Sequence, residues 1–157
     1  MSENHNEEKT NLEFSAVENF LKWYNTTNDT QLEIRECRDR PDIILSNNVG
    51  IEVAHIFPND KCAQVLLRPQ PLSASYDDSD FIKEFNRIIE EKYIEIPSYK
   101  YNGDIILLLR VSIKNFDQNY FQRIRRKINI PANCPFKIYV SFYNSTTNDW
   151  CVVVELL

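Results

Sequence analysis

The chain has 157 residues, of which 43% are hydrophobic and 26% charged, so it is long enough to bury the core of one globular domain. Its 18 basic and 23 acidic residues give a net charge of −5, which argues against a protein that coats nucleic acid through bulk charge. No apolar run approaches the ~20 residues of a membrane span, and the polar start is unlike a signal peptide, so we expect a cytoplasmic protein without membrane contact.

The first predicted helix covers about residues 12–24 and follows a polar tail, residues 1–11, that we expect to be disordered. Thr10 and Glu13 have the spacing of a capping box, which marks the start of a helix. Apolar side chains then recur at steps of three and four and share one face. The residues of that face are Phe14, Val17, Leu21 and Tyr24.

Three strands are predicted next, over residues 31–36, 42–46 and 49–57. Asn47 and Asn48 give a turn signal between the second strand and the third. These two strands are apolar on both faces, apart from two acids and one histidine. A strand that is buried on both faces belongs in the middle of a sheet covered by helices.

The second half of the chain alternates helices and strands. Residues 58–79 form an irregular stretch, in which a short helix at 61–67 fits the pattern. The elements expected after it are a helix at 80–93, a strand at 104–111, a basic helix at 118–127 and closing strands at 136–142 and 150–156. A helix that crosses over between two strands predicts that they are parallel. The sequence therefore predicts the α/β fold class, with a mixed central sheet flanked by helices in a single domain, residues 12–157.

Two carboxylates, Asp42 and Glu52, stand in the otherwise apolar strands. A lone buried carboxylate is costly, and two on one face repel each other unless a cation lies between them. Mg²⁺ is a hard cation that one or two carboxylates hold together with water and phosphate, so the pair predicts a magnesium site. The four cysteines form no CxxC pair and give a zinc ribbon no support.

The register of the hairpin decides whether the two acids meet. Side chains alternate along a strand, so Asp42 and Glu52 share a face only if the numbers of paired residues add up to an even sum. Pairing Ser46 with Gly50 would make Asp42 and Glu52 diagonal neighbours about 7–8 Å apart. Pairing Ser46 with Val49 would send the acids to opposite faces.

Pro41-Asp42, a short hairpin and Glu52-Val53-Ala54 together resemble the motif of the PD-(D/E)xK, or restriction-endonuclease-like, nucleases. The core of that superfamily is a helix, a three-strand meander, a helix and a parallel strand, which is the order predicted over residues 12–111. The resemblance implies a restriction-endonuclease-like core with extra C-terminal strands. It also implies a metal-dependent nuclease that hydrolyses phosphodiester bonds in nucleic acid, above all DNA.

The resemblance further implies which groups hold the metal. Asp42 and Glu52 would bind Mg²⁺ or Mn²⁺, helped by the main-chain carbonyl of Val53, and the ion would activate a water. An acid on the first helix contributes in some members, a place that Glu18 can fill if it is not simply a solvated helix acid. Glu36, at the end of the first strand, is a comparable candidate.

The sequence departs from the motif at its lysine, whose position is Ala54. That lysine would orient the attacking water and offset charge on the phosphate. Lys92 lies within the apolar stripe of the helix at 80–93 and should face the sheet near Glu52, so it is the expected replacement; alternatively its stem only covers the core. Lys83 points away from the stripe and is the weaker candidate.

Basic residues lie at two places where a nucleic-acid backbone could be held. Arg38 and Arg40 precede Asp42 closely, and they would either hold a phosphate near the metal or only balance the acids. A second run, near the C-terminal third of the chain, would track a backbone or form a solvated face. Its residues are Arg123, Arg125, Arg126 and Lys127. His55 should point to the face opposite Glu52 and serve a structural role.

Three functions stay open at this level. The first is a metal-dependent nuclease, with host defence or mobile-element biology as the setting that the resemblance implies. The second is a catalytically inactive relative that serves as a binding or regulatory module, with Ala54 marking lost catalysis. The third is an immunity-type or adaptor protein that binds another protein through its acidic surface. A protein partner or a homodimer could supply the nucleic-acid affinity that the acidic total lacks.

Overall fold

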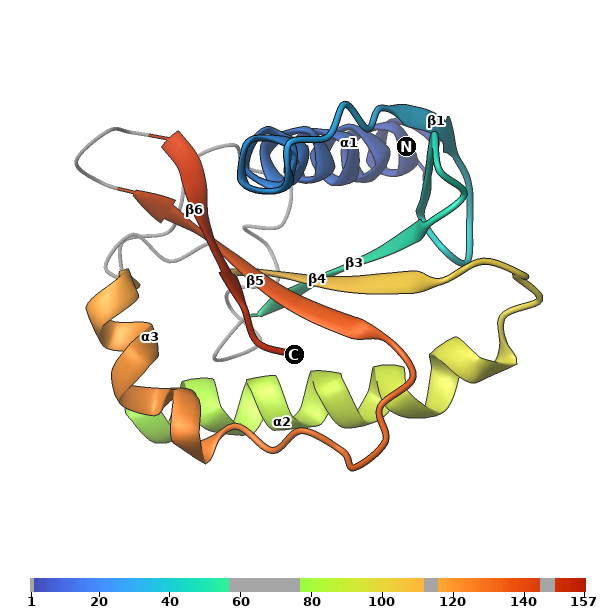
Figure 1. Cartoon of the computed structure of the whole chain (residues 1–157). Helices are drawn as coiled ribbons and strands as arrows, with labels where there is room; N and C mark the ends of the chain where they lie inside the picture. The colour runs from blue at the N-terminus through green and yellow to red at the C-terminus, as the bar shows by residue number, and fades with distance from the viewer. Residues whose placement is uncertain (1, 57–76, 112–115, 145–148) are drawn as a thin grey trace.

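The computed structural model describes residues 2–56, 77–111, 116–144 and 149–157. One six-stranded sheet, in the order β1-β2-β3-β4-β5-β6, carries helices on both faces, with α1 on one side and α2 and α3 on the other (Figure 1). The elements are α1 (Ser2–Asn28), β1 (Ile34–Cys37), β2 (Ile43–Leu45), β3 (Gly50–Ile56), α2 (Asp78–Glu95), η2 (Ile96–Ser98), β4 (Ile105–Val111), α3 (Gln118–Ile124), η3 (Arg125–Lys127), β5 (Lys137–Asn144) and β6 (Asp149–Glu155). The predicted mixed α/β sheet flanked by helices is confirmed.

The first helix is longer than the sequence pattern indicated. It begins at Ser2, so residues 2–11, which were expected to be a disordered tail, are helical. No glycine or proline precedes Pro41 to interrupt it, and adding a residue to an existing helix costs far less than starting one. At the other end, Asn25 binds both backbone groups of Leu32 at 3.0 Å, which turns the chain toward β1.

The β2–β3 hairpin has the even register that lets its acids share a face. Ile43 pairs with Ile51 and Ile44 with Gly50, a register that has the parity of the Ser46–Gly50 alternative but lies two positions away from it, and that excludes the Ser46–Val49 alternative. Asn48 adopts a φ of 67°, a left-handed conformation that asparagine tolerates, and so ends the turn one residue early. Gly50 thereby enters the strand, where an added Cβ would lie 2.5 Å from Cγ of Pro41.

The centre of the sheet is parallel. β3 pairs with β4 in parallel, as the crossover through α2 predicted, and β4 pairs with β5 in the same sense. β6 closes the sheet as an antiparallel edge strand. The predicted helix at 61–67 and most of the irregular stretch at 58–79 lie outside the described residues.

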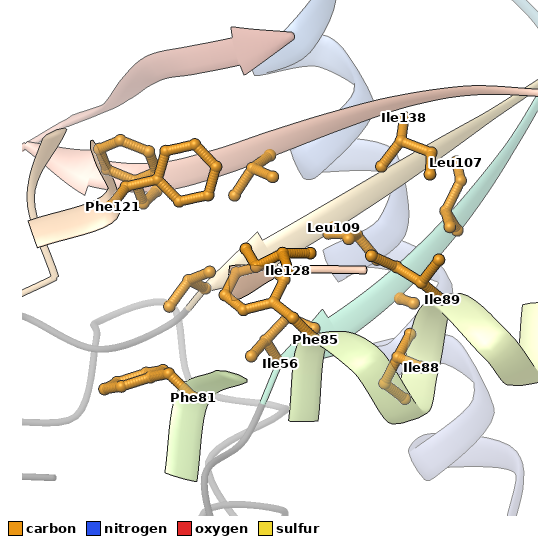
Figure 2. Packing of buried hydrophobic residues seen from close by; sticks show 14 of the residues in the cluster. Ile56, Phe81, Phe85, Ile88, Ile89, Leu107, Leu109, Phe121, Ile128 and Ile138 are labelled. Atoms are coloured by element: carbon orange, nitrogen blue, oxygen red, sulfur yellow. The ribbon is translucent and has the colours of Figure 1, made fainter. Parts of the chain in front are cut away.

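Two hydrophobic layers enclose this sheet. On the α2 side, α2 and α3 pack against alternate side chains of the central strands (Figure 2); the labelled residues are Ile56, Phe81, Phe85, Ile88, Ile89, Leu107, Leu109, Phe121, Ile128 and Ile138. On the α1 side, α1 packs against the intervening side chains, among them Ile51, Val53 and Leu108. Glu52 therefore faces the α2 layer, because it alternates with Ile51 and Val53. Among the described helices, none combines the length and the apolar character that a membrane crossing requires.

Candidate metal and phosphodiester site

The β2–β3 hairpin brings Asp42 and Glu52 together. Asp42 immediately precedes β2, and continuing the hairpin register places it directly across from Glu52. Gly50 donates its N–H to β4, so Glu52, two residues on, also directs its backbone away from β2. Such a pair lacks mutual backbone hydrogen bonds, which brings its side chains closest together. The acids thus face each other directly rather than diagonally.

The backbone of Val53 fixes the Asp42 carboxylate. Oδ2 of Asp42 accepts the Val53 N–H at 2.9 Å. The N–H and C=O of one strand residue point toward the same neighbour, so the Val53 carbonyl also faces the Asp42 side, beyond the last paired residue of β2. The Val53 carbonyl and the Asp42 carboxylate therefore lie on the same side of β3, at the end of the hairpin.

Glu52 is buried, with only 5% of its surface exposed, and its two oxygens have different surroundings. Oε2 accepts hydrogen bonds from Lys92 Nζ, at 2.9 Å, and from the Tyr99 hydroxyl. Oε1 is equally buried and accepts no hydrogen bond of regular geometry among the described residues, although the Asp42 carboxyl group lies close enough to share a proton with the Glu52 carboxylate. A buried oxygen without a donor is costly, so one side of this carboxylate is ready to accept a ligand.

Lys92 extends from α2 to the acids. Its Nζ contacts Glu52 at 2.9 Å and Oε2 of Glu95 at 3.3 Å. Burial alone would lower the pKa of Lys92, but the hydrogen bonds and charges of Glu52 and Glu95 raise it above its usual value. Lys92 therefore keeps its positive charge beside Glu52. Lys83, on the same helix, is exposed to solvent.

A third acid, Glu13 of α1, lies close to this pair. Its exposed fraction is 7%, although its spacing from Thr10 predicted only a capping role. Burial, reinforced by the charges of Glu52 and Asp39 and opposed by Lys9, raises the pKa of Glu13 to about 7. The missed signal was its helical spacing: Glu13 lies three, four and seven residues before the buried Ala16, Val17 and Phe20.

Neither of the two acids expected to assist the pair is buried with it. Glu18 lies on the exposed side of α1, and Glu36 is exposed on β1. The expected helix face included Phe14, which is 37% exposed, so the buried face of α1 is turned toward Glu13 instead. Glu13 lines the same pocket as Asp42.

The acids strongly affect each other's protonation. Burial, then the charges of Glu52 and Glu13, raise the pKa of Asp42 to about 8, and the hydrogen bond from Val53 only partly opposes them. At neutral pH the cluster therefore holds protons that ordinary surface carboxylates would have lost. A cation placed among these groups would remove their repulsion and displace those protons.

An open pocket of about 430 Å³ gives solvent access to Asp42 and Glu13, whereas Glu52 is not among its described lining residues. It is lined by Lys9, Thr10, Glu13, Cys37, Arg38, Asp39 and Asp42. Asp42 and Glu13 are thus open to solvent, and two cations, Lys9 and Arg38, stand beside them. Arg38, one of the two expected phosphate contacts, lines the pocket; Arg40 is exposed and is not among the described lining residues.

The basic run of α3 and η3 is not part of this pocket. Arg123 binds Asp78 through two hydrogen bonds, at 3.1 and 3.2 Å, and Arg125 donates to the backbone of Glu155 at 2.8 Å. Arg126 and Lys127 are exposed. The expectation that these four side chains track a phosphate backbone stays a prediction, and such a contact would lie away from the acids.

His55 is on the face of β3 opposite Glu52, as strand alternation predicts. Burial, followed by the charges of Arg110 and Lys9, lowers its pKa to about 3, so the imidazole is neutral at physiological pH. It is therefore poorly suited to exchange protons with the acids on the other face.

The residues present suit a hard divalent cation. No group of three or more His, Cys, Asp or Glu side chains within the described ranges converges closely enough to hold a metal on its own. Mg²⁺, however, commonly takes only one or two protein carboxylates and keeps several waters. The unpartnered Oε1 of Glu52, the facing Asp42 carboxylate and the Val53 carbonyl supply oxygen ligands of the kind this ion prefers.

Comparison with protein-family models, with curated proteins and with solved structures finds no match to this chain. The chemistry available to the site is therefore the basis for assigning a function.

Proposed function

We propose that the chain is a metal-dependent nuclease with a restriction-endonuclease-like core, which hydrolyses phosphodiester bonds in nucleic acid, with DNA as the first candidate. The observation that carries this proposal is the state of Glu52: its Oε2 is bound by Lys92 and Tyr99, and its buried Oε1, on the side of Asp42, accepts no hydrogen bond of regular geometry from the described residues. The element order helix, three antiparallel strands, helix and parallel strand supports the proposed core.

Asp42, Glu52 and the Val53 carbonyl would hold the ion, Mg²⁺ or Mn²⁺. When bound there, such an ion supplies Lewis-acid stabilisation of the phosphodiester and makes water a better nucleophile. The protein's part is to keep the carboxylates in register through the hairpin and to supply the fixed N–H of Val53, so that little reorganisation is needed on binding.

Lys92 takes the role of the motif lysine that Ala54 replaces. An ammonium group has three N–H donors, and Glu52 and Glu95 engage two of them, which leaves one to orient water or a phosphate oxygen. Its raised pKa suits charge compensation and hydrogen-bond donation, not proton abstraction at neutral pH. Glu13, whose pKa is about 7, is better placed to exchange a proton with water in the pocket.

Lys9 and Arg38 make the pocket suitable for an anion. They stand beside three acids of the lining, whose charges a divalent cation would balance as it displaces the protons that Asp42 and Glu13 hold at neutral pH. A phosphodiester would then meet a cationic pocket although the whole chain carries a charge of −5.

A catalytically inactive, metal-binding relative is the second candidate. The observation that favours it is that Lys92 is held by two carboxylates, which restrains the very group expected to act on water. In that case the pocket would bind metal and phosphate without turnover.

The test is cleavage by the purified full chain. Plasmid, linear DNA and RNA are incubated with Mg²⁺ or Mn²⁺ and, separately, with EDTA, using wild type, Asp42→Asn and Glu52→Gln. Asp29→Asn and Glu36→Gln are matched controls, because both residues are exposed and neither lines the pocket. We expect metal-dependent cleavage in wild type and in both controls, and a loss of at least 100-fold in the two site variants, a range typical for loss of a key stabilising group.

Metal binding without cleavage in wild type would select the inactive relative. Cleavage that persists in Asp42→Asn and Glu52→Gln would show that the hydrolytic site lies elsewhere or belongs to a contaminant.

A further inference from the structure

We propose that Tyr99 is a positioning residue for Glu52: its hydroxyl and the Lys92 ammonium engage one oxygen of the carboxylate and so commit the other oxygen to a divalent cation. This inference rests on the proposed metal site and adds a residue that belongs neither to the acidic motif nor to the pocket lining.

The local backbone holds Tyr99 firmly. It directly follows η2, a short 3₁₀ turn that ends α2 and carries Pro97 in its first turn. The Tyr99 N–H donates to Ile96 at 3.0 Å, and the Tyr99 carbonyl accepts the N–H of Tyr101 at 2.9 Å. The ring packs against the core layer on the α2 side. The phenol is therefore presented to Glu52 by a rigid segment.

The hydrogen bonds on Glu52 are divided unevenly. Lys92 and Tyr99 both donate to Oε2, whereas the buried Oε1 accepts a hydrogen bond of regular geometry from none of the described residues and has only the Asp42 carboxyl group beside it. An unsatisfied buried acceptor costs roughly 1–3 kcal/mol, so an arrangement that spread the two donors over both oxygens would favour the metal-free protein. The uneven division makes sense if Oε1 is a ligand position.

A neutral donor suits this task better than a second cation. Two cations on Glu52 would cancel its charge and compete with a metal ion, whereas a hydroxyl orients the carboxylate and leaves the charge in place. The geometry gives the phenol this role, because its hydroxyl is the donor and the carboxylate oxygen the acceptor in the contact.

Tyr99→Phe tests the inference, because it removes the hydroxyl and keeps the ring that packs in the core. Tyr101→Phe is the matched control: its hydroxyl donates to the carbonyl of Asn48, in the hairpin turn, and not to an acid. Mn²⁺ binding to the full chain is measured by calorimetry for wild type and both variants, with melting temperatures in EDTA. Asp42→Asn serves as the variant without a metal site.

We expect Tyr99→Phe to weaken Mn²⁺ binding by about 10–100-fold, the range found when groups that orient a metal ligand are removed. Tyr101→Phe should bind Mn²⁺ within twofold of wild type. In EDTA, Tyr99→Phe should melt no lower than Tyr101→Phe, a result that separates positioning from a general structural role. If cleavage occurs, Tyr99→Phe should raise the Mn²⁺ concentration for half-maximal rate and change the rate at saturating Mn²⁺ by less than about threefold.

Wild type that binds Mn²⁺ while Tyr99→Phe binds it equally well would overturn the role of Tyr99 and leave the proposed nuclease site standing. Equal losses of affinity in both tyrosine variants would also overturn it, since the effect would not be specific to the Glu52 contact. Wild type that binds no Mn²⁺ would overturn the proposed function and this inference together.

Discussion

Replacing Asp42 with asparagine should stabilise the metal-free protein at pH 8. The amide keeps the shape of the side chain, and its oxygen can still accept the N–H of Val53. Its NH₂ group can donate toward Glu52, where Oε1 has no partner among the described residues. The substitution therefore exchanges a repulsive pair of carboxyl groups for a hydrogen-bonded pair.

The magnitude follows from protonation. Burial, then Glu52 and Glu13, raise the pKa of Asp42 from 3.8 to about 8 in the folded chain. Because the folded state binds this proton more tightly than the unfolded chain does, the contribution of Asp42 to stability is fully present below about pH 4 and is lost as pH rises through about 8. At about 1.4 kcal/mol per pH unit, this difference between the unfolded and folded pKa corresponds to on the order of 5 kcal/mol in the free energy of unfolding. Water in the adjoining pocket screens the charges and reduces this contribution to about 2–3 kcal/mol.

Urea unfolding in EDTA at several pH values between about 5 and 8 measures this difference. Wild type should lose about 2 kcal/mol relative to Asp42→Asn across that range, since the range covers most but not all of the window. Asp29→Asn, an exposed control, should run parallel to wild type. A difference between wild type and Asp42→Asn that does not change with pH, or an Asp42→Asn protein that is less stable at pH 8, would refute the reasoning.

Three further variants test other parts of the site. Lys92→Met should abolish cleavage and lower the free energy of unfolding by roughly 3 kcal/mol, because it leaves Glu52 buried without its cation. Lys83→Met, at an exposed position, is the control and should change neither cleavage nor stability in the same assays. Gly50→Ala should lower stability by about 1–3 kcal/mol and weaken Mn²⁺ binding in calorimetry, since the new methyl group would push Pro41, and with it Asp42, out of place; unchanged Mn²⁺ affinity would contradict this. Glu13→Gln should alter the pH dependence of Mn²⁺ affinity between about pH 6 and 8, and Glu18→Gln should leave it unchanged; identical profiles would remove Glu13 from the site.

The strand alternation made the acidic pair predictable. Two carboxylates in strands that are otherwise apolar had to share a face or be separated by the sheet, and only the parity of the register decided between the two. The position of Lys92 was equally readable, because it lies in the stripe of α2 that packs on the sheet. The step of two in the register depends on the left-handed Asn48 and on the contact between Pro41 and Gly50, which no periodic pattern shows.

Each group that sequence reasoning missed was hidden for its own physical reason. Glu13 occupies a core position on α1, where an acid is unusual, so a prediction from the hydrophobic pattern of the helix assigns it to the surface. Tyr99 follows a 3₁₀ turn, so no helix or strand period predicts where its hydroxyl points. Long-range partners such as Asp78 for Arg123 are equally invisible in the sequence, and they decide how much of a basic run stays available.

The most direct measurement is a crystal structure of the protein with Mn²⁺, using anomalous scattering to locate the ion. We expect one peak between the carboxylates of Asp42 and Glu52, on the Oε1 side, with Lys92 and Tyr99 still bound to Oε2. Crystals that contain excess Mn²⁺ at pH 8 but show no peak there, or that show the Lys92 ammonium in that position, would contradict the claim that this hairpin is a metal site.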